Sequence, residues 1–176
     1  MILKFATDTR RLVLLRHAKA EPAGSVPDNL RPLALNGRRQ ASAVGGMLNE
    51  LGIIPDAVLV SSALRTRQTW ELLSNGLDLE TSFAQFHDDL YVAQPRDVLS
   101  ILSGHGSATT VLVVGHEPTM STLATLLSGP GSDQKAFDTV RFGLPTSGFA
   151  VLESPLEFGQ WDQDSAVLVA HDRPAV

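Results

Sequence analysis

The chain has 176 residues, of which 43% are hydrophobic, and this size and composition predict one globular domain over residues 1–176. A net charge of −5 and scattered arginines argue against nucleic acid as a partner, and the absence of cysteine excludes disulfide bonds and thiolate chemistry. The amino terminus lacks the apolar core of a signal peptide, and no apolar run approaches the roughly 20 residues of a membrane-spanning helix. We therefore expect a cytoplasmic protein without a membrane partner.

The first predicted strand ends in two residues that are suited to a functional site. Residues 12–17 read Leu-Val-Leu-Leu-Arg-His, a short apolar run of the kind found in strands that are covered on both faces. In open α/β sheets the carboxyl ends of such strands border the ligand-binding crevice. Arg16 and His17 are therefore candidate site residues, although a polar strand end is the alternative explanation.

The next segments predict a loop and then a helix. Residues 20–31 contain two prolines, a glycine and an aspartate, which favour an irregular loop over the site. Residues 36–50 begin at Asn36, a suitable helix cap, and carry apolar residues at helical spacing. This pattern predicts the first crossover helix, which ends before Gly52 and Pro55.

A second strand and helix bring another arginine to a strand end. Residues 57–60 are apolar, and a short polar turn leads from them into a predicted helix over 64–74, with Arg65 at its start. A further helix is predicted over 96–103, behind Pro95.

The pattern of apolar strand and terminal histidine occurs again at residues 111–116. Four apolar residues lead into Gly115 and His116, and Pro118 opens a helix with apolar residues along one face. Residues 147–152 and 165–169 read as late strands, which we expect to pair antiparallel across a polar turn. These elements predict a three-layer α/β/α sandwich, with a mostly parallel central sheet and an antiparallel portion.

Two arginines and two histidines converge on one edge of this predicted sheet. Guanidinium groups match phosphoryl oxygens bidentately, so a pocket of this composition is suited to a tetrahedral phosphoryl dianion. For each arginine alone, a surface ion pair is the alternative.

The residues around these strand ends resemble the motifs of a known family. They are Arg16-His17-Ala18, the segment Ser-Ala-Leu-Arg-Thr-Arg-Gln-Thr at 62–69, and Gly115-His116-Glu117-Pro118. They resemble the histidine phosphatase superfamily, whose phosphoglycerate mutases and phosphatases share a phosphohistidine intermediate, and the likeness covers nearly the whole chain. Residues 28–37 resemble the small SixA-type branch, which is associated with removing phosphate from phosphohistidine in signalling proteins. The resemblance implies a phosphoglycerate mutase-like fold.

This chain departs from the family pattern at two positions. Ala18 stands where the family usually has glycine, and Glu117 places a negative charge beside the second histidine. Neither departure removes a catalytic side chain of the family.

The predicted chemistry is phosphoryl transfer through a histidine. His17 is the expected nucleophile, because a neutral imidazole with an ordinary pKa of about 6.5 can attack when a backbone carbonyl holds its other nitrogen. Water then hydrolyses the phosphohistidine. Arg16 and Arg65 bind the nonbridging oxygens, and His116 donates a further hydrogen bond, for which an imidazolium is one form. We expect Arg67 to point away, and we expect three further histidines to be structural or solvated: His87, His105 and His171.

The assignment of a proton donor depends on the resemblance alone, which implies a carboxylate near the end of the third strand. Asp89 aligns best, and Asp88 and Glu117 are the alternatives. The two strand-end histidines have no carboxylate partner at ligand spacing, and the arginines supply the charge of a metal ion, so we expect no metal or other cofactor.

Three functions are compatible with this pocket. The resemblance favours a phosphatase that acts on phosphohistidine in a signalling protein, because the chain lacks room for a large helical insertion over the site. A small-molecule phosphomonoesterase would use the same residues. A non-catalytic phosphate-binding module, disabled at Ala18 or Glu117, is the alternative from another class.

Overall fold

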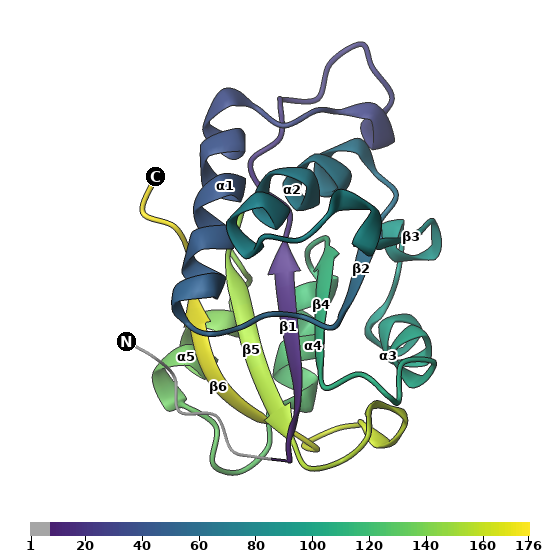
Figure 1. Ribbon diagram of the computed structural model, residues 1–176, viewed down its shortest axis with the longest axis vertical. Coiled ribbons are helices and arrows are strands. Elements are labelled where there is room, and N and C mark those ends of the chain that lie inside the picture. Colours follow the sequence, from purple (N-terminus) through teal and green to yellow (C-terminus); the bar gives the residue numbers. More distant parts are fainter. Residues whose placement is uncertain (1–7) are drawn as a thin grey trace.

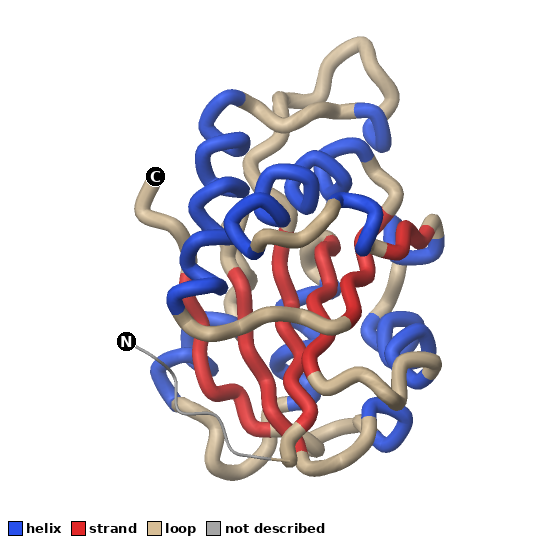
Figure 2. Tube along the Cα trace, viewed as in Figure 1, coloured by secondary structure: helices blue, strands red, loops and turns tan. Residues whose placement is uncertain are grey.

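The computed structural model describes residues 8–176 and contains a six-stranded sheet flanked by helices (Figures 1 and 2). The segment before residue 8, part of the region in which the sequence predicts no signal peptide, lies outside the described residues. The strands are β1 (Arg10–Arg16), β2 (Ala57–Ser61), β3 (Gln85–His87), β4 (Thr110–Gly115), β5 (Phe149–Ser154) and β6 (Val167–Asp172).

The order of the strands confirms a mostly parallel sheet. The order is β3-β2-β4-β1-β5-β6, and the first four strands run parallel to one another. β5 is antiparallel to both β1 and β6, which confirms the predicted pairing of the late strands. The carboxyl ends of β1, β2 and β4 consequently lie at the same edge of the sheet.

Strand β1 shows why an uninterrupted apolar run marks a central strand. The four residues from Leu12 to Leu15 are 0% exposed. Because side chains alternate along a strand, Leu12 and Leu14 pack into one hydrophobic cluster and Val13 and Leu15 into another on the opposite face. Both faces of the strand are therefore covered, as the sequence predicts.

Helices cover both faces of the sheet, which confirms the three-layer architecture. They are α1 (Leu35–Glu50), α2 (Leu64–Ser74), α3 (Pro95–Ser103), α4 (Thr119–Leu127) and α5 (Gln134–Val140). Helices α1 and α2 share one hydrophobic cluster with the sheet, and α3, α4 and α5 contribute to the other. Figure 1 shows α1 and α2 in front of the sheet and α4 behind it. None of the helices within residues 8–176 is both long and apolar enough to cross a membrane.

The loop between β1 and α1 lies beyond the carboxyl ends of the strands, at the top of Figure 1. It contains the 3₁₀ helix Asp28–Leu30, and an isolated bridge between Ala20 and Leu33 closes its base. Arg31 donates to the carbonyl of Glu21 at 2.8 Å and thereby ties the two ends of the loop together. The sequence predicts a loop over the site here, and it contributes a side chain to that site.

Candidate active site

The candidate site lies where the three parallel strands β1, β4 and β2 end side by side. Arg16 is the last residue of β1 and His17 follows it, whereas His116 follows β4. Arg65 lies in the first turn of α2, just after β2. Because β4 lies between β1 and β2, these four side chains gather at one edge of the sheet, as the sequence predicts.

The ring of His17 is held with one nitrogen bonded and the other directed toward Arg65. Its Nδ1 lies 2.7 Å from the carbonyl oxygen of Ala18, the kind of acceptor expected from the sequence. Its Nε2 accepts from Arg65 Nε at 3.3 Å. Burial is the main reason that the pKa of His17 falls to about 4, and the guanidinium of Arg65 lowers it further. His17 is therefore neutral at pH 7, with the Nε2 lone pair directed into the pocket.

His116 completes the opposite side of the pocket. Its ring centroid lies 5.2 Å from that of His17, and its Nδ1 lies 3.4 Å from Arg65 Nη2. Its Nε2 lies 2.8 Å from the hydroxyl of Ser61, the last residue of β2. Burial, followed by the charge of His17, lowers the pKa of His116 to about 3. The imidazolium form considered from the sequence is therefore disfavoured in this structure at neutral pH.

Arg16 is anchored by the segment that leads into β5. Its Nη1 donates to the carbonyl of Leu144 at 2.7 Å, and its backbone N–H donates to the carbonyl of Gly148 at 3.0 Å. The backbone N–H of Ser147 donates to the carbonyl of His17 at 3.2 Å. This segment therefore fixes Arg16 and His17 together at the end of β1.

Comparisons with known proteins agree with this geometry. Residues 12–88 match the model of the histidine phosphatase superfamily (branch 1). An uncharacterised protein of Mycobacterium tuberculosis is 38% identical over 162 residues, which are 91% of this chain and 99% of that protein. A candidate SixA phosphohistidine phosphatase from Nakamurella multipartitia is 32% identical, with a TM-score of 0.82 over 96% of this chain and 98% of that chain.

A second solved structure extends the likeness. It is a candidate SixA phosphohistidine phosphatase from Agrobacterium tumefaciens, 28% identical with a TM-score of 0.76, and the match covers 94% of this chain and 99% of that chain. The chain belongs to the histidine phosphatase superfamily, in its SixA-type branch. The sheet and its helical layers are accordingly the phosphoglycerate mutase-like fold, and the comparisons support a phosphatase activity.

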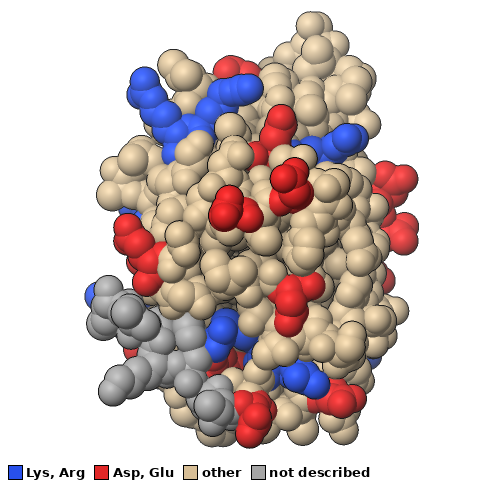
Figure 3. Space-filling model, viewed as in Figure 1, with Lys and Arg blue, Asp and Glu red and all other residues tan. Residues whose placement is uncertain are grey.

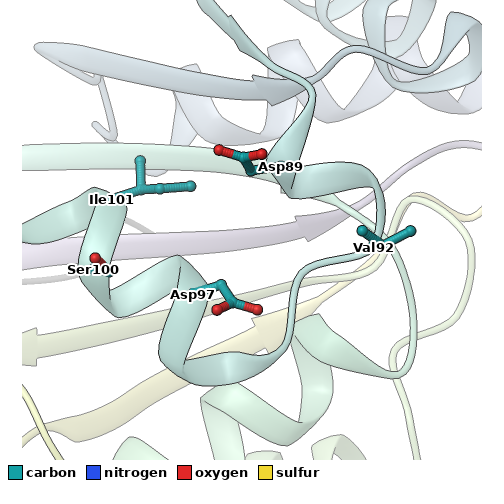
Figure 4. Close-up of a pocket in the computed structure, with 5 residues that line it drawn as sticks. All are labelled: Asp89, Val92, Asp97, Ser100 and Ile101. Atoms are coloured by element: carbon teal, nitrogen blue, oxygen red, sulfur yellow. The ribbon is translucent and has the colours of Figure 1, made fainter.

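The candidate proton donors of this histidine phosphatase lie apart from the four pocket residues. Asp89 is exposed and lines a separate pocket against α3, together with four other residues: Val92, Asp97, Ser100 and Ile101 (Figure 4). Glu117 accepts from the backbone N–H of Ser121 at 3.1 Å and from its hydroxyl at 2.5 Å, at the start of α4. Asp88 is exposed. Within the described part of the chain, no hydrogen bond joins these three carboxylates to the pocket.

Two of the side chains expected to lie outside the pocket have partners elsewhere. The guanidinium of Arg67 lies 5.0 Å from the ring centroid of Phe86, and the Nδ1 of His171 lies 3.0 Å from the carbonyl oxygen of Phe149. No group of three or more His, Cys, Asp or Glu residues suited to a metal ion occurs between residues 8 and 176.

Three residues of the site were missed by sequence reasoning. Asp28 accepts from Arg65, Tyr91 packs its ring edge-on to His116 with 5.5 Å between centroids, and Ser61 bonds to His116. Asp28 lies in the segment that resembles the SixA-type branch, and this is the signal that was available for it. Ser61 ends an apolar strand, where a polar residue is a candidate for the crevice. Nothing local in the sequence marks Tyr91.

Proposed function

We propose that this protein is a phosphatase that removes phosphate from phosphohistidine on a protein, through a phosphohistidine formed at His17. The observation that carries the proposal is the state of His17. The imidazole is neutral, its Nδ1 is bonded to the Ala18 carbonyl, and its Nε2 lone pair faces the Arg65 guanidinium. A nucleophile of this kind needs no separate base at pH 7.

The reaction takes place in two steps. In the first, His17 Nε2 forms a bond to phosphorus while the bond from phosphorus to the leaving group breaks. The guanidinium groups of Arg16 and Arg65 stabilise charge on the nonbridging oxygens, and His116 contributes a further hydrogen bond. In the second, a water oxygen bonds to phosphorus, the bond from phosphorus to Nε2 breaks, and the water proton passes to the released phosphate.

A phosphoramidate substrate is compatible with carboxylates that make no hydrogen bond to the pocket. An alkoxide leaving group needs a proton donor, and Asp88, Asp89 and Glu117 make no hydrogen bond to the four pocket residues within the part of the chain described. A phosphohistidine that carries a proton on its other ring nitrogen leaves as a neutral imidazole. It therefore requires no acid in the pocket.

Support also comes from the related structures and the shape of the chain. Both of the SixA-type structures compared above are described as candidate phosphohistidine phosphatases. The segment between β1 and α1 is a loop with a single 3₁₀ helix and has no large helical insertion. A site bordered by such a loop suits a side chain presented by another protein.

The test is phosphate release from a phosphohistidine peptide, a phosphoserine peptide and a panel of phosphorylated metabolites, in EDTA, with wild type and His17→Ala. We expect rapid turnover of the phosphohistidine peptide and its loss in His17→Ala. Radioactive phosphate transferred to the wild type but not to the variant would identify the intermediate. A preference for metabolites would replace the protein substrate with a small-molecule one, and activity that returned only with a divalent ion would contradict the mechanism.

Asp89 provides a separate prediction about the leaving group. The family resemblance implies that it protonates an ester oxygen, and catalytic contacts often tighten only when substrate binds. Asp89→Asn is expected to lower ester hydrolysis by about 10²- to 10⁴-fold and phosphohistidine hydrolysis by less than about threefold. Steady-state rates on both substrates check this, and an unchanged ester rate would remove Asp89 from the mechanism.

A further inference from the structure

Arg65 uses two different edges of its guanidinium group. One edge faces the pocket, with Nε 3.3 Å from His17 Nε2 and Nη2 3.4 Å from His116 Nδ1. The other edge faces Asp28, with Nη1 2.7 Å from the Asp28 carbonyl oxygen and Nη2 3.0 Å from Oδ2. A guanidinium is planar and presents its five N–H donors in a fixed fork, so contacts on one edge set the direction of the other.

We infer that Asp28 is a positioning residue for Arg65, which it holds from the outer edge so that the inner edge presents a bidentate fork to the phosphoryl group. The inference rests on the proposed function for the identity of the bound group. Asp28 contacts the outer edge, and the inner edge remains directed at the two histidines. Asp28 therefore acts through Arg65 and need not touch the substrate.

Burial of Arg65 makes this outer contact important. Arg65 is 5% exposed, and a guanidinium removed from water requires compensation of its charge. Among residues 8–176, Asp28 is the carboxylate that forms an ion pair with Arg65, at 3.0 Å. Loss of that carboxylate would leave only a neutral carbonyl on the outer edge. The guanidinium could then rotate, and the pocket would lose a preorganised pair of donors.

Both carboxylate oxygens of Asp28 accept hydrogen bonds from side chains other than Arg65. Oδ2 also accepts from the hydroxyl of Tyr91 at 2.5 Å, and Oδ1 accepts from Arg31 Nε at 2.8 Å. The Tyr91 hydrogen bond is the largest cause that holds the pKa of Asp28 well below its usual range, so the carboxylate stays charged. The three side-chain partners fix the orientation of the Asp28 carboxylate, although half of the Asp28 side chain is exposed.

Tyr91 links this carboxylate to the second histidine. Its ring meets His116 edge-on, and the guanidinium carbon of Arg65 lies 5.7 Å from the ring centroid. Asp28, Tyr91, Arg65 and His116 therefore form one connected unit, drawn from the loop after β1, the turn after β3, the start of α2 and the end of β4. The residues that would bind the phosphoryl group are oriented by two residues that would not.

The test measures oxyanion binding, which is independent of turnover. Vanadate affinity by calorimetry and kcat and KM with the phosphohistidine peptide are compared in wild type, Asp28→Ala, Arg65→Ala and the double variant. We expect Asp28→Ala to weaken vanadate binding by roughly tenfold and to lower kcat/KM by about 10- to 100-fold. If Asp28 acts through Arg65, Asp28→Ala has little further effect when Arg65 is alanine. Additive losses would overturn the inference.

Two further variants separate positioning from loop stability. Arg31→Lys keeps the positive charge that acts on His17, removes the guanidinium that bonds to Oδ1 and to the Glu21 carbonyl, and leaves the contact between Asp28 and Arg65, so we expect a change in vanadate affinity below about threefold. Equal losses in Arg31→Lys and Asp28→Ala would show that the loop alone matters and would overturn the inference. Tyr91→Phe keeps the ring and removes the hydrogen bond, and its effect should be non-additive with that of Asp28→Ala.

The same measurements distinguish the inference from the proposed function. Coupling between Asp28 and Arg65 in vanadate binding, without turnover of any phosphorylated substrate, would support the positioning role and contradict the phosphatase. Turnover that depends on His17, with independent effects of Asp28 and Arg65, would support the phosphatase and overturn the positioning role.

Discussion

At the scale of single residues, burial sets the protonation state of the two pocket histidines. Burial is the main cause that lowers both pKa values, and the Arg65 guanidinium, which lies near both rings, lowers them further. The bond from His17 Nδ1 to the Ala18 carbonyl then decides which ring nitrogen carries the hydrogen. The reactive lone pair is consequently on Nε2.

Because His17 is buried and neutral, we predict that its imidazole is protonated only at acidic pH. We expect its imidazole to titrate near pH 4, below the value of about 6.5 of an unfolded reference. Protonation removes the Nε2 lone pair, so activity is retained at neutral pH and falls as pH drops through that value. Histidine ring NMR signals against pH check this, with the His17 signal assigned by its absence from His17→Ala. A midpoint near 6.5 for His17 would contradict the prediction.

Ser61 is predicted to orient His116. Its hydroxyl is 0% exposed and lies 2.8 Å from His116 Nε2, so Ser61→Ala leaves a buried ring nitrogen without its partner. We expect kcat/KM to fall by about tenfold and the free energy of unfolding by about 1 kcal/mol. Ser74→Ala is the matched control, because that buried hydroxyl bonds only within α2. Equal kinetic effects of the two variants would show that Ser61 has no particular role.

At the scale of elements, the packing of α1 against α2 determines where Arg65 lies. Arg65 is in the first turn of α2, and Thr69 in the next turn accepts from the backbone N–H of Ala18, beside the nucleophile. The end of α2 approaches α1 closely at Gly45, where an added Cβ would lie 2.1 Å from the Leu73 carbonyl oxygen. That approach admits no side chain without a shift of backbone.

Two adjacent glycines of α1 give a matched pair of variants. Alanine normally stabilises a helix interior relative to glycine by about 1 kcal/mol, and at Gly46 nothing lies within 4 Å of the added Cβ. We therefore expect Gly46→Ala to raise the free energy of unfolding by about 0.5–1 kcal/mol, and Gly45→Ala to lower it by more than about 2 kcal/mol. Urea unfolding measures both, and shifts of the same sign would contradict the close approach.

The elements that sequence reasoning missed are short or polar. β3 has three residues with little apolar content, and α5 has seven, too few for a clear helical period. α5 begins at a cap, since the side chain of Asp133 accepts from the backbone N–H of Ala136 at 2.7 Å. Their positions depend on neighbouring elements, because β3 is an edge strand that pairs only with β2 and α5 packs on β6. Long elements with a regular apolar pattern, such as β1 and α1, were predicted correctly.

At the scale of the whole molecule, the net negative charge of the chain contrasts with a pocket that contains two arginines. On the face shown in Figure 3, acidic and basic side chains are interspersed and form no continuous surface of one sign. The net charge is −5, whereas the pocket brings together two arginines beside two neutral histidines. An anionic group is therefore attracted by the pocket in particular.

The buried neutral histidines predict loss of stability in mild acid. Their pKa values are lower in the folded protein than in the unfolded chain, so between about pH 4 and 6.5 the unfolded chain binds more protons. Their contribution to stability is complete above pH 6.5 and is lost as the pH falls toward 4. We expect a lower urea midpoint at pH 5 than at pH 7, and a smaller difference in His17→Ala. Equal midpoints for the wild type would contradict this.

The sequence by itself determined the apolar strands, their buried faces and the residues at the carboxyl ends of β1 and β4. Alternation and apolar runs encode these features locally, so Arg16, His17, Arg65 and His116 were identified from the chain alone. Only the tertiary structure brought Asp28 to Arg65 and Tyr91, which lie 37 and 63 residues away along the chain, and turned Asp89 toward α3. The physical reason is that a strand's direction follows from its own residues, whereas a contact between distant loops depends on every turn and packing surface that connects them.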